Sequence, residues 1–347
     1  MSGSKKILIL NSLQSYHGST ARLRAISETL ENLGHQIVFH QPTTNALRRM
    51  FSSMKTCLHG DYEILWTQKL NPITLPSMLI ARLRSKLVIV DWDDWDTGLQ
   101  QNIVFAFLSY ICETLGHWIP NLITSHSYRL LKKVSRTTPT HYLRQALPSP
   151  QTSTPSFQDK TNLETAYRHI LGWRQQKDIN ITAYLCTMTS GGAMDLPYIL
   201  QEWSKHHAVN QNHLLVIGGG PKLLAMITLA KKLSLEGKVF FAGWISSSDL
   251  PQLLSQLDDG LIYMSDTKSN QLRVSLKILH YMNAGIPIWG NVVGETKEQY
   301  GQWIANCHIA DKGMSFHSPE RISLDLHTKE LKKDIESLIA NHPTWFS

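Results

Sequence analysis

The sequence predicts an α/β fold made of two Rossmann-like domains, and three observations support this prediction. Short apolar runs typical of buried strands alternate with segments of helical periodicity. The alternation occurs twice, before and after a stretch rich in Pro, Ser and Thr. The chain has 347 residues, which is long for one core and ordinary for two domains. We expect the two sheets to face each other across a cleft that receives the carboxyl ends of their strands.

The first predicted domain spans residues 1–146. After its first strand, Leu23, Ile26 and Leu30 recur at helical spacing until Gly34 ends the helix. The expected strands cover 6–11, 36–41, 62–67, 86–92, 121–126 and 140–145.

A linker is predicted over 147–175, because Pro, Ser and Thr dominate its first part. The second domain, 176–347, then repeats the alternation, with Pro197 in the first turn of its first helix. Its expected strands cover 180–187, 213–220, 238–243, 260–264 and 286–291, and its expected helices cover 195–203, 222–233, 247–257, 275–285 and 295–304.

The charge and cysteine content favour a cytoplasmic protein with an anionic ligand or surface as partner. The formal net charge is +7, yet no dense Lys/Arg run is present, so nucleic acid is not an expected partner. The four cysteines are widely spaced, without a metal-binding pattern or a disulfide framework. The amino terminus lacks a long apolar run with a cleavage site.

The most hydrophobic segment, 103–119, contains Glu113 and His117 and is not a clean membrane span. We expect a buried or interfacial helix there. Together with the basic balance, this segment suggests a peripheral contact with an anionic membrane and a lipid-linked acceptor.

Three stretches of the second half carry a family resemblance. They are "LLVIGGGP", "KVFFAGWISSSDLPQLLSQLDDGLIY" and "SLKILHYMNAGIPIWGNVVGETKE". In order and spacing they resemble the retaining glycosyltransferases of the GT-B fold (glycosyltransferase family 4, group 1). The first half is similar more loosely, through "KILILNSLQSYHGSTARLRAISETLENLGHQI" and "LVIVDWDDWDTG". The likeness covers about residues 6–300.

The resemblance implies a UDP- or GDP-linked sugar as donor and no further cofactor. Helix amino termini and glycine turns favour a diphosphate, and the loop after the strand at 238–243 would hold the base. The candidate donor-binding residues are Gly18, Ser19, Ser190, Gly191, Gly192, Gly243, Trp244, Ile245, Arg273, Ser275, Lys277 and His280.

The candidate catalytic residues follow two strands of the first domain. Asp91, Asp93 and Asp94 end the strand at 86–92, and His126 ends the strand at 121–126. The aspartates are expected to contact sugar or acceptor hydroxyls; capping and metal binding are the alternatives. Retaining transfer on this fold needs no protein nucleophile, so positioning and charge stabilisation would carry the reaction.

The donor site departs from the family pattern. His280 stands where the family has a glutamate that holds the ribose, and an imidazole cannot accept from two hydroxyls as a carboxylate does. Leu272 replaces another glutamate, and "LCTMTSGGAMDL" lacks the family's arginine and lysine. The chain could also end before the family's last helix, which returns to the first domain.

Three functions therefore remain open. The first is an active transferase with a changed donor grip and a glycan, lipid-linked or other acceptor. The second is a non-catalytic partner subunit, and the third is a sugar-nucleotide epimerase.

Overall fold

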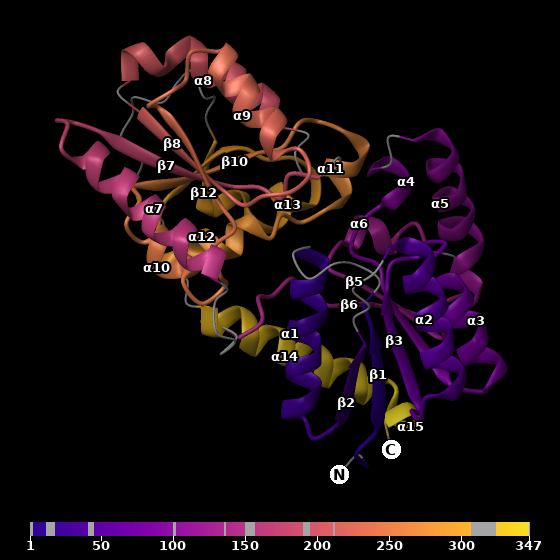
Figure 1. Cartoon of the computed structure of the whole chain (residues 1–347). Coiled ribbons are helices and arrows are strands. Elements are labelled where there is room, and N and C mark those ends of the chain that lie inside the picture. The colour runs from indigo at the N-terminus through magenta and orange to yellow at the C-terminus, as the bar shows by residue number, and fades with distance from the viewer. Residues whose placement is uncertain are drawn as a thin grey trace. The chain divides into compact units, whose positions relative to one another are not determined.

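The computed structural model describes residues 3–11, 18–40, 45–99, 102–134, 137–149, 157–189, 195–210, 212–306 and 324–346. The chain forms two compact units, and each is built on a six-stranded sheet (Figure 1). Unit 1 comprises Met1–Ser149, Gln271–Val274 and Asp325–Ser347. Unit 2 comprises Pro150–Asn270 and Ser275–Leu324.

The sheet of unit 1 is entirely parallel, with strand order β2-β1-β3-β4-β5-β6. Its strands are β1 Lys6–Leu10, β2 Gln36–His40, β3 Ile64–Gln68, β4 Leu87–Asp91, β5 Leu122–Ser125 and β6 Thr140–Tyr142. Its helices are α1 Gly18–Asn32, α2 Ala46–His59, α3 Leu75–Leu83, α4 Asp96–Leu99, α5 Ile103–Leu115, the 3₁₀ turn η1 Gly116–Trp118, α6 Tyr128–Leu131, α14 Leu324–Asn341 and α15 Pro343–Phe346.

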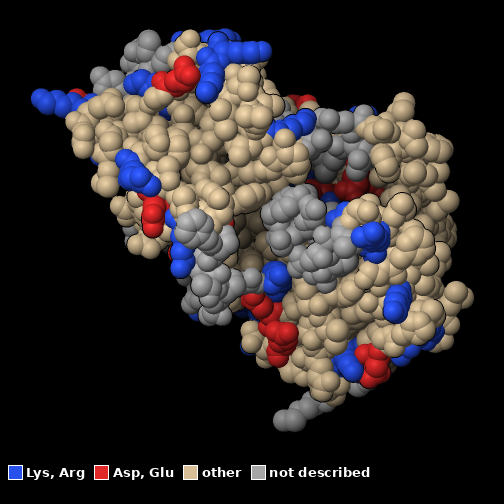
Figure 2. Space-filling model, viewed as in Figure 1, with Lys and Arg blue, Asp and Glu red and all other residues tan. Residues whose placement is uncertain are grey.

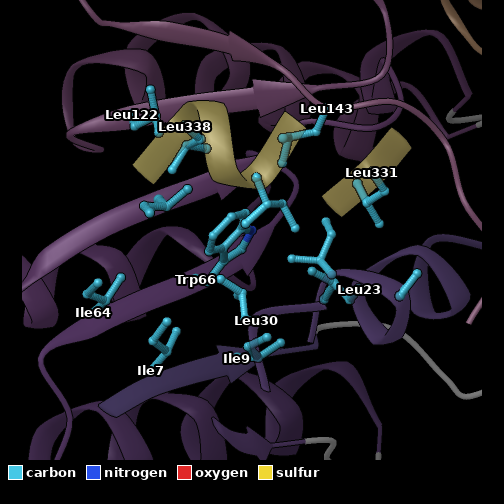
Figure 3. Packing of buried hydrophobic residues seen from close by; sticks show 14 of the residues in the cluster. Ile7, Ile9, Leu23, Leu30, Ile64, Trp66, Leu122, Leu143, Leu331 and Leu338 are labelled. Atoms are coloured by element: carbon cyan, nitrogen blue, oxygen red, sulfur yellow. The ribbon is translucent and has the colours of Figure 1, made fainter. Parts of the chain in front are cut away.

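Successive residues of each strand in this sheet face two different helical layers, as the period of two requires. Ile7 and Ile9 pack in a core with α1 and α14, whereas Leu8 and Leu10 pack in a second core with α2 and α3. Figure 3 shows the first core, in which Trp66 of β3 lies among aliphatic side chains of α1 and α14. The strands are therefore apolar on both faces, which explains their uninterrupted hydrophobic runs.

The last helices of the chain belong to unit 1. Leu331 and Leu338 of α14 are buried in the first core. Asp334 accepts from Arg144 Nε at 2.9 Å, which ties α14 to the segment after β6. The sequence predicts one second domain over 176–347, without a final helix that returns to the first domain, whereas α14 is such a helix and packs in unit 1.

Unit 2 repeats the design with strand order β12-β11-β10-β7-β8-β9, again parallel throughout. Its strands are β7 Asn180–Leu185, β8 Asn212–Ile217, β9 Val239–Gly243, β10 Asp259–Tyr263, β11 Ile288–Asn291 and β12 Ile304–Asn306. Its helices are α7 Phe157–Arg174, α8 Leu196–Asn210, α9 Leu223–Lys232, α10 Leu250–Leu254, α11 Lys268–Leu272 (whose last two residues belong to unit 1), α12 Lys277–Ala284, α13 Gly294–Tyr300 and the 3₁₀ turn η2 Gly301–Trp303.

Two predicted elements of this half differ from the structure. The linker expected over 147–175 contains α7, whose Ile170 and Trp173 are buried in unit 2. The Trp173 indole donates to the Gly237 carbonyl at 2.9 Å. The helix expected over 295–304 ends at Tyr300, and β12 follows it as an edge strand.

The apolar segment 103–119 forms α5 and η1 on the surface of unit 1 rather than inside it. Asn102 caps α5 by accepting from the N–H of Val104 at 2.9 Å. None of the helices that the structure describes combines the length and apolarity needed to cross a bilayer. Three cysteines in the described part of the chain, Cys57, Cys112 and Cys186, are buried free thiols.

Candidate functional site

Each sheet has a topological switch point, where neighbouring strands continue in opposite directions. In unit 1 the switch lies between β1 and β3, and in unit 2 it lies between β7 and β10. Ligands of open parallel sheets bind at the carboxyl ends of the strands beside such a switch. The loops at the carboxyl ends of the strands beside and near each switch are therefore the candidate ligand sites.

A buried lysine dominates the unit 1 loops. Lys69, directly after β3, is 4% exposed, and its ammonium group lies 2.8 Å from Asp96, 3.4 Å from Asp94 and 3.5 Å from Asp93. Burial opposes the charge of this lysine, but the three carboxylates outweigh burial and hold its pKa well above the usual value. Lys69 therefore supplies the positive charge that balances the acidic loop after β4.

The backbone holds Lys69 in an uncommon conformation for this purpose. Its φ is +64°, in the left-handed region that a lysine rarely adopts. Its N–H donates to the Asp91 carbonyl at 2.9 Å, and its carbonyl accepts from Thr74 Oγ1 at 2.8 Å. The sequence analysis missed Lys69, because a lysine that follows a strand is usually solvent-exposed and its partners lie about 25 residues further along the chain.

Asp93 is the most perturbed carboxyl group of the site. It is 3% exposed, and burial raises its pKa to about 6, with Lys69 acting in the opposite direction. Ser19, at the start of α1, donates a hydrogen bond to it. Asp94 is partly exposed, and although burial opposes ionisation, Lys69 and Arg273 lower its pKa.

Asp91 has a different environment from its two neighbours. Arg22 of α1 binds it through two hydrogen bonds, from Nε at 2.7 Å and from Nη2 at 2.9 Å, and Thr124 donates to it at 2.8 Å. Arg22 and Asp91 are each 1% exposed. The sequence grouped Asp91 with Asp93 and Asp94 as a contact for hydroxyls, but its geometry is that of a buried ion pair that attaches α1 to β4.

His126 and Arg273 lie in the same unit as the aspartates. His126 Nε2 accepts from the Val274 N–H at 3.3 Å, which places the proton of the neutral ring on Nδ1. Burial lowers the pKa of His126 to about 3, so the ring is neutral at pH 7. Segment Gln271–Val274 belongs to unit 1, and Arg273 acts electrostatically on Asp94. The structure thus places Arg273 in unit 1, where it acts on the acidic loop, and its contact with the donor stays a prediction.

Gln68, the last residue of β3, is a second feature that the sequence analysis missed. It is fully buried, and neither atom of its amide has a hydrogen-bond partner among the described residues. It pairs in register with Asp91 of β4, and its own strand β3 borders the switch. Buried amides normally have hydrogen-bond partners in the protein or in ordered water. Gln68 thus marks a polar position at the carboxyl edge of this sheet.

In unit 2, Lys277 and His280 lie on α12, which follows the β10 loop. The Lys277 ammonium lies 4.1 Å from the ring centroid of Tyr184, which belongs to β7 across the switch. His280 comes three residues later and so shares the same side of the helix. Burial lowers the pKa of His280 to about 4, so it is a neutral donor and acceptor at pH 7.

Tyr281 fixes the position of α12 over the switch. Its hydroxyl accepts from the Leu185 N–H at 3.1 Å and faces the Leu261 carbonyl at 3.1 Å, so it joins β7 and β10. A Cβ at Gly260 would lie 2.6 Å from the Tyr281 ring, so a glycine is required there. The buried side chain of Tyr281 thus attaches α12, the helix that carries Lys277, to strands β7 and β10.

The "GGGP" turn after β8 has a packing role. A Cβ at Gly218 would lie 2.1 Å from the Cys186 carbonyl oxygen, and one at Gly220 would lie 2.7 Å from that of Met188. Both glycines also have positive φ, at +124° and +142°. These glycines allow the turn to pack against the end of β7.

The loop after β9 uses backbone carbonyl groups for hydrogen bonds within unit 2. The Gly243 carbonyl accepts from the Gly218 N–H at 2.8 Å, and the Trp244 carbonyl accepts from Asn162 at 2.9 Å. The Trp244 indole packs so closely on Gly219 that a Cβ there would lie 2.7 Å from it. Ile245 makes no backbone hydrogen bond to the described part of the chain. Of the three residues predicted to read a base, Ile245 has its backbone groups available.

Of the remaining predicted donor residues, Ser275 and Gly18 belong to the described part of the chain and three others do not. The Ser275 N–H donates to Thr296 Oγ1 at 3.2 Å, which leaves its hydroxyl as the candidate contact. Gly18 begins α1 in unit 1, next to Ser19. Ser190, Gly191 and Gly192 lie outside the described residues. No cluster of three His, Cys, Asp or Glu side chains suited to a metal ion occurs among the residues described.

Comparisons with solved structures identify the architecture. Trehalose-6-phosphate synthase matches with a TM-score of 0.59 at 9% identity, covering 97% of this chain and 98% of that one. Anabaena HepE, solved with UDP, matches with a TM-score of 0.56 at 13% identity, covering 97% and 90%. The UDP-GlcNAc 2-epimerase of Methanocaldococcus jannaschii, solved with UDP-GlcNAc and UDP, gives 0.53 at 11%, covering 97% and 99%.

The chain has the GT-B fold. The neighbours include glycosyltransferases and UDP-sugar epimerases, at identities that establish the architecture alone. No protein-family model matches the sequence, and no curated protein matches it.

Proposed function

We propose that the protein is a retaining glycosyltransferase that uses a UDP- or GDP-linked sugar. The observation that carries the proposal is the position of Lys277 and His280 on a firmly held helix at the β7/β10 switch of a GT-B chain. Two structures of similar fold were solved with UDP, which supports a nucleotide-sugar as ligand here.

Unit 2 would bind the donor. Lys277 is a cation that Tyr184 positions, and it suits the diphosphate. Neutral His280 would exchange one hydrogen bond with a ribose hydroxyl, in a weaker grip than a carboxylate gives. Ser190, Gly191, Gly192 and the Ser275 hydroxyl would complete the phosphate contacts, and the Ile245 backbone the base contact. Trp244 and Gly243 would shape that loop.

Unit 1 would bind the acceptor hydroxyl. Asp93 has a pKa of about 6, so its carboxylate can accept a hydrogen bond at neutral pH, and Ser19 already orients it. Gln68 offers a donor and an acceptor at the same switch point. Lys69 balances Asp93, Asp94 and Asp96 with its own charge, so the proposal includes no metal ion and no cofactor besides the donor.

The chemistry requires few protein groups. The bond between the anomeric carbon and the diphosphate oxygen breaks as the acceptor oxygen attacks the same face. The acceptor proton passes to the departing diphosphate oxygen. Lys277 stabilises the charge that develops on the diphosphate, and Asp93 orients the acceptor hydroxyl.

Epimerisation of a UDP-sugar is the second candidate, because an epimerase is among the structures of similar fold. A non-catalytic role is the third, because the donor grip departs from the family pattern at His280. Calorimetry with UDP, GDP and their sugars separates binding from non-binding. An epimerase would also convert the donor without any acceptor, which nuclear magnetic resonance detects directly.

The decisive variant is Lys277→Ala. The matched control is Lys231→Ala, which changes an exposed lysine of α9. We expect Lys277→Ala to weaken nucleotide binding at least tenfold, roughly 1.4 kcal/mol, and Lys231→Ala to leave it unchanged. His280→Glu should tighten binding by restoring a second acceptor for the ribose. Absence of binding by every nucleotide, or equal affinities of the two lysine variants, would refute the proposal.

A further inference from the structure

Exposed apolar side chains concentrate in one helical layer of unit 1. The layer consists of α2, α3, α5 and η1, and α2 and α3 share the core beneath it. Gly116, which follows α5, contacts Leu70 and Leu75 so closely that an added Cβ would lie within 3.3 Å of either, which joins α5 to α3. Thirteen of the eighteen exposed large hydrophobic residues in the described chain belong to this layer. They are Leu47, Phe51, Leu58, Leu79, Leu83, Ile103, Val104, Phe105, Phe107, Leu108, Tyr110, Leu115 and Trp118.

The outer surface of α5 carries no charge. Its only Asp, Glu, Lys, Arg or His residue is Glu113, which is 4% exposed and turned inward. Glu113 accepts from the N–H groups of Asp96 and Thr97, at 2.7 and 3.2 Å, and so caps α4. Ile103 is 83% exposed and Trp118 66%. In Figure 2 the visible surface over α5 is free of Lys, Arg, Asp and Glu.

The charged residues carried by α2 and α3 themselves are all basic. Arg48 and Lys55 of α2 and Arg82 of α3 are exposed, and neither helix contains an acidic residue. Basic side chains over α2 border the uncharged area in Figure 2. Cations beside an exposed apolar surface match an anionic lipid bilayer, whose headgroups attract the cations while its interior receives the apolar side chains.

We propose that this layer of unit 1 binds flat on an anionic membrane surface. The thirteen residues of α5 extend about 20 Å, too short to span a bilayer and sufficient to lie along it. A second copy of the chain is a poorer occupant, because α2 and α3 of two copies would present only basic charges to each other, from residues such as Arg48, Lys55 and Arg82. The inference concerns side chains other than those proposed to bind the nucleotide, and it does not rest on the transferase proposal.

Flotation of the full chain with vesicles tests the inference. Vesicles of phosphatidylcholine alone are compared with vesicles that contain about one third phosphatidylglycerol, at low and high salt. We expect binding to the anionic vesicles at low salt that weakens as salt rises, because the Debye length shortens. The double variant Phe105→Ser/Phe107→Ser should reduce the bound fraction at least tenfold. Arg48→Gln/Lys55→Gln should weaken binding and flatten its dependence on salt.

The matched control is Leu171→Ser/Leu224→Ser, which changes two exposed leucines of unit 2. It should bind vesicles as the unchanged chain does. All of the changed side chains are exposed, so each variant should keep its circular dichroism and thermal melt. Absence of binding to anionic vesicles at low salt would overturn the inference. So would unaltered binding by Phe105→Ser/Phe107→Ser, or a dimer in sedimentation that this variant dissociates without any vesicle binding.

Discussion

Lys69→Met tests the electrostatic design of unit 1. The change removes the ammonium group that lies between 2.8 and 3.5 Å from three carboxylates and leaves a side chain of similar length. Both residues meet the same backbone strain at φ +64°, so the comparison isolates the charge. Asp93, Asp94 and Asp96 would then lose the ammonium group that all three share, although Arg273 would still act on Asp94.

The magnitude follows from the distances. At an effective dielectric constant of about 20, the 2.8 Å pair with Asp96 alone has a gross attraction of roughly 6 kcal/mol. Desolvation of the buried ions opposes most of this, and removing one partner of a buried ion pair costs about 3–5 kcal/mol. We expect a loss of that size at pH 8. The loss should be smaller at pH 5, because Asp93, with a pKa of about 6, takes up a proton and relieves the repulsion.

Urea unfolding followed by tryptophan fluorescence measures this loss, since Trp66 and Trp92 are buried in unit 1. Lys332→Met is the control: it removes an exposed lysine of α14 that lies 3.8 Å from Glu336. Such a pair contributes about 0.3–0.5 kcal/mol. If Lys69→Met lost no more stability than Lys332→Met, or lost equal amounts at pH 5 and pH 8, the reasoning about this lysine would be refuted.

Three further predictions follow from packing and titration. Gly218→Ala should destabilise unit 2 by roughly 2–4 kcal/mol, because the new Cβ would lie 2.1 Å from a carbonyl oxygen. Gly172→Ala, in open space on α7, should stabilise it slightly, and equal urea midpoints would contradict this contrast. Leu338→Ala should cost about 2–5 kcal/mol in unit 1, measured against exposed Leu171→Ala; a loss below 1 kcal/mol would remove α14 from the core. Transfer activity should rise as the pH passes about 6 and the Asp93 carboxyl ionises, and a kcat/KM profile that keeps this step in Asp93→Asn would assign it to another group.

The sequence predicted the strands well for a physical reason. In both units the strands are buried on both faces, so runs such as "KILIL" and "NITAYL" are apolar without interruption. Glycines also predicted the ends of helices correctly: Gly285 ends α12 with φ +68°. The two-unit architecture was thus predictable from local patterns, and the solved structures of similar fold confirm it.

Long-range assignments were not predictable in the same way. The amphipathic pattern of α14 indicates a helix but not which core receives it, and the core of unit 1 does. Helix α7 was not predicted, because the Pro- and Ser-rich residues before it indicated a linker. The surroundings of Lys69 and Arg273 could not be predicted, because they depend on residues about 25 and about 180 positions away. A lysine immediately after a buried strand, followed by an acidic run after the next strand, is the signal that could have identified Lys69.

The central claim is that this chain transfers sugar from a nucleotide with retention of configuration. The most direct measurement is proton nuclear magnetic resonance of the anomeric signals while the purified chain acts on UDP- and GDP-sugars, with anionic vesicles and candidate acceptors present. The account predicts release of the nucleotide and a product whose first-formed anomer has the configuration of the donor. A donor epimerised at another carbon, a product of inverted configuration, or complete inertness toward every donor would contradict it.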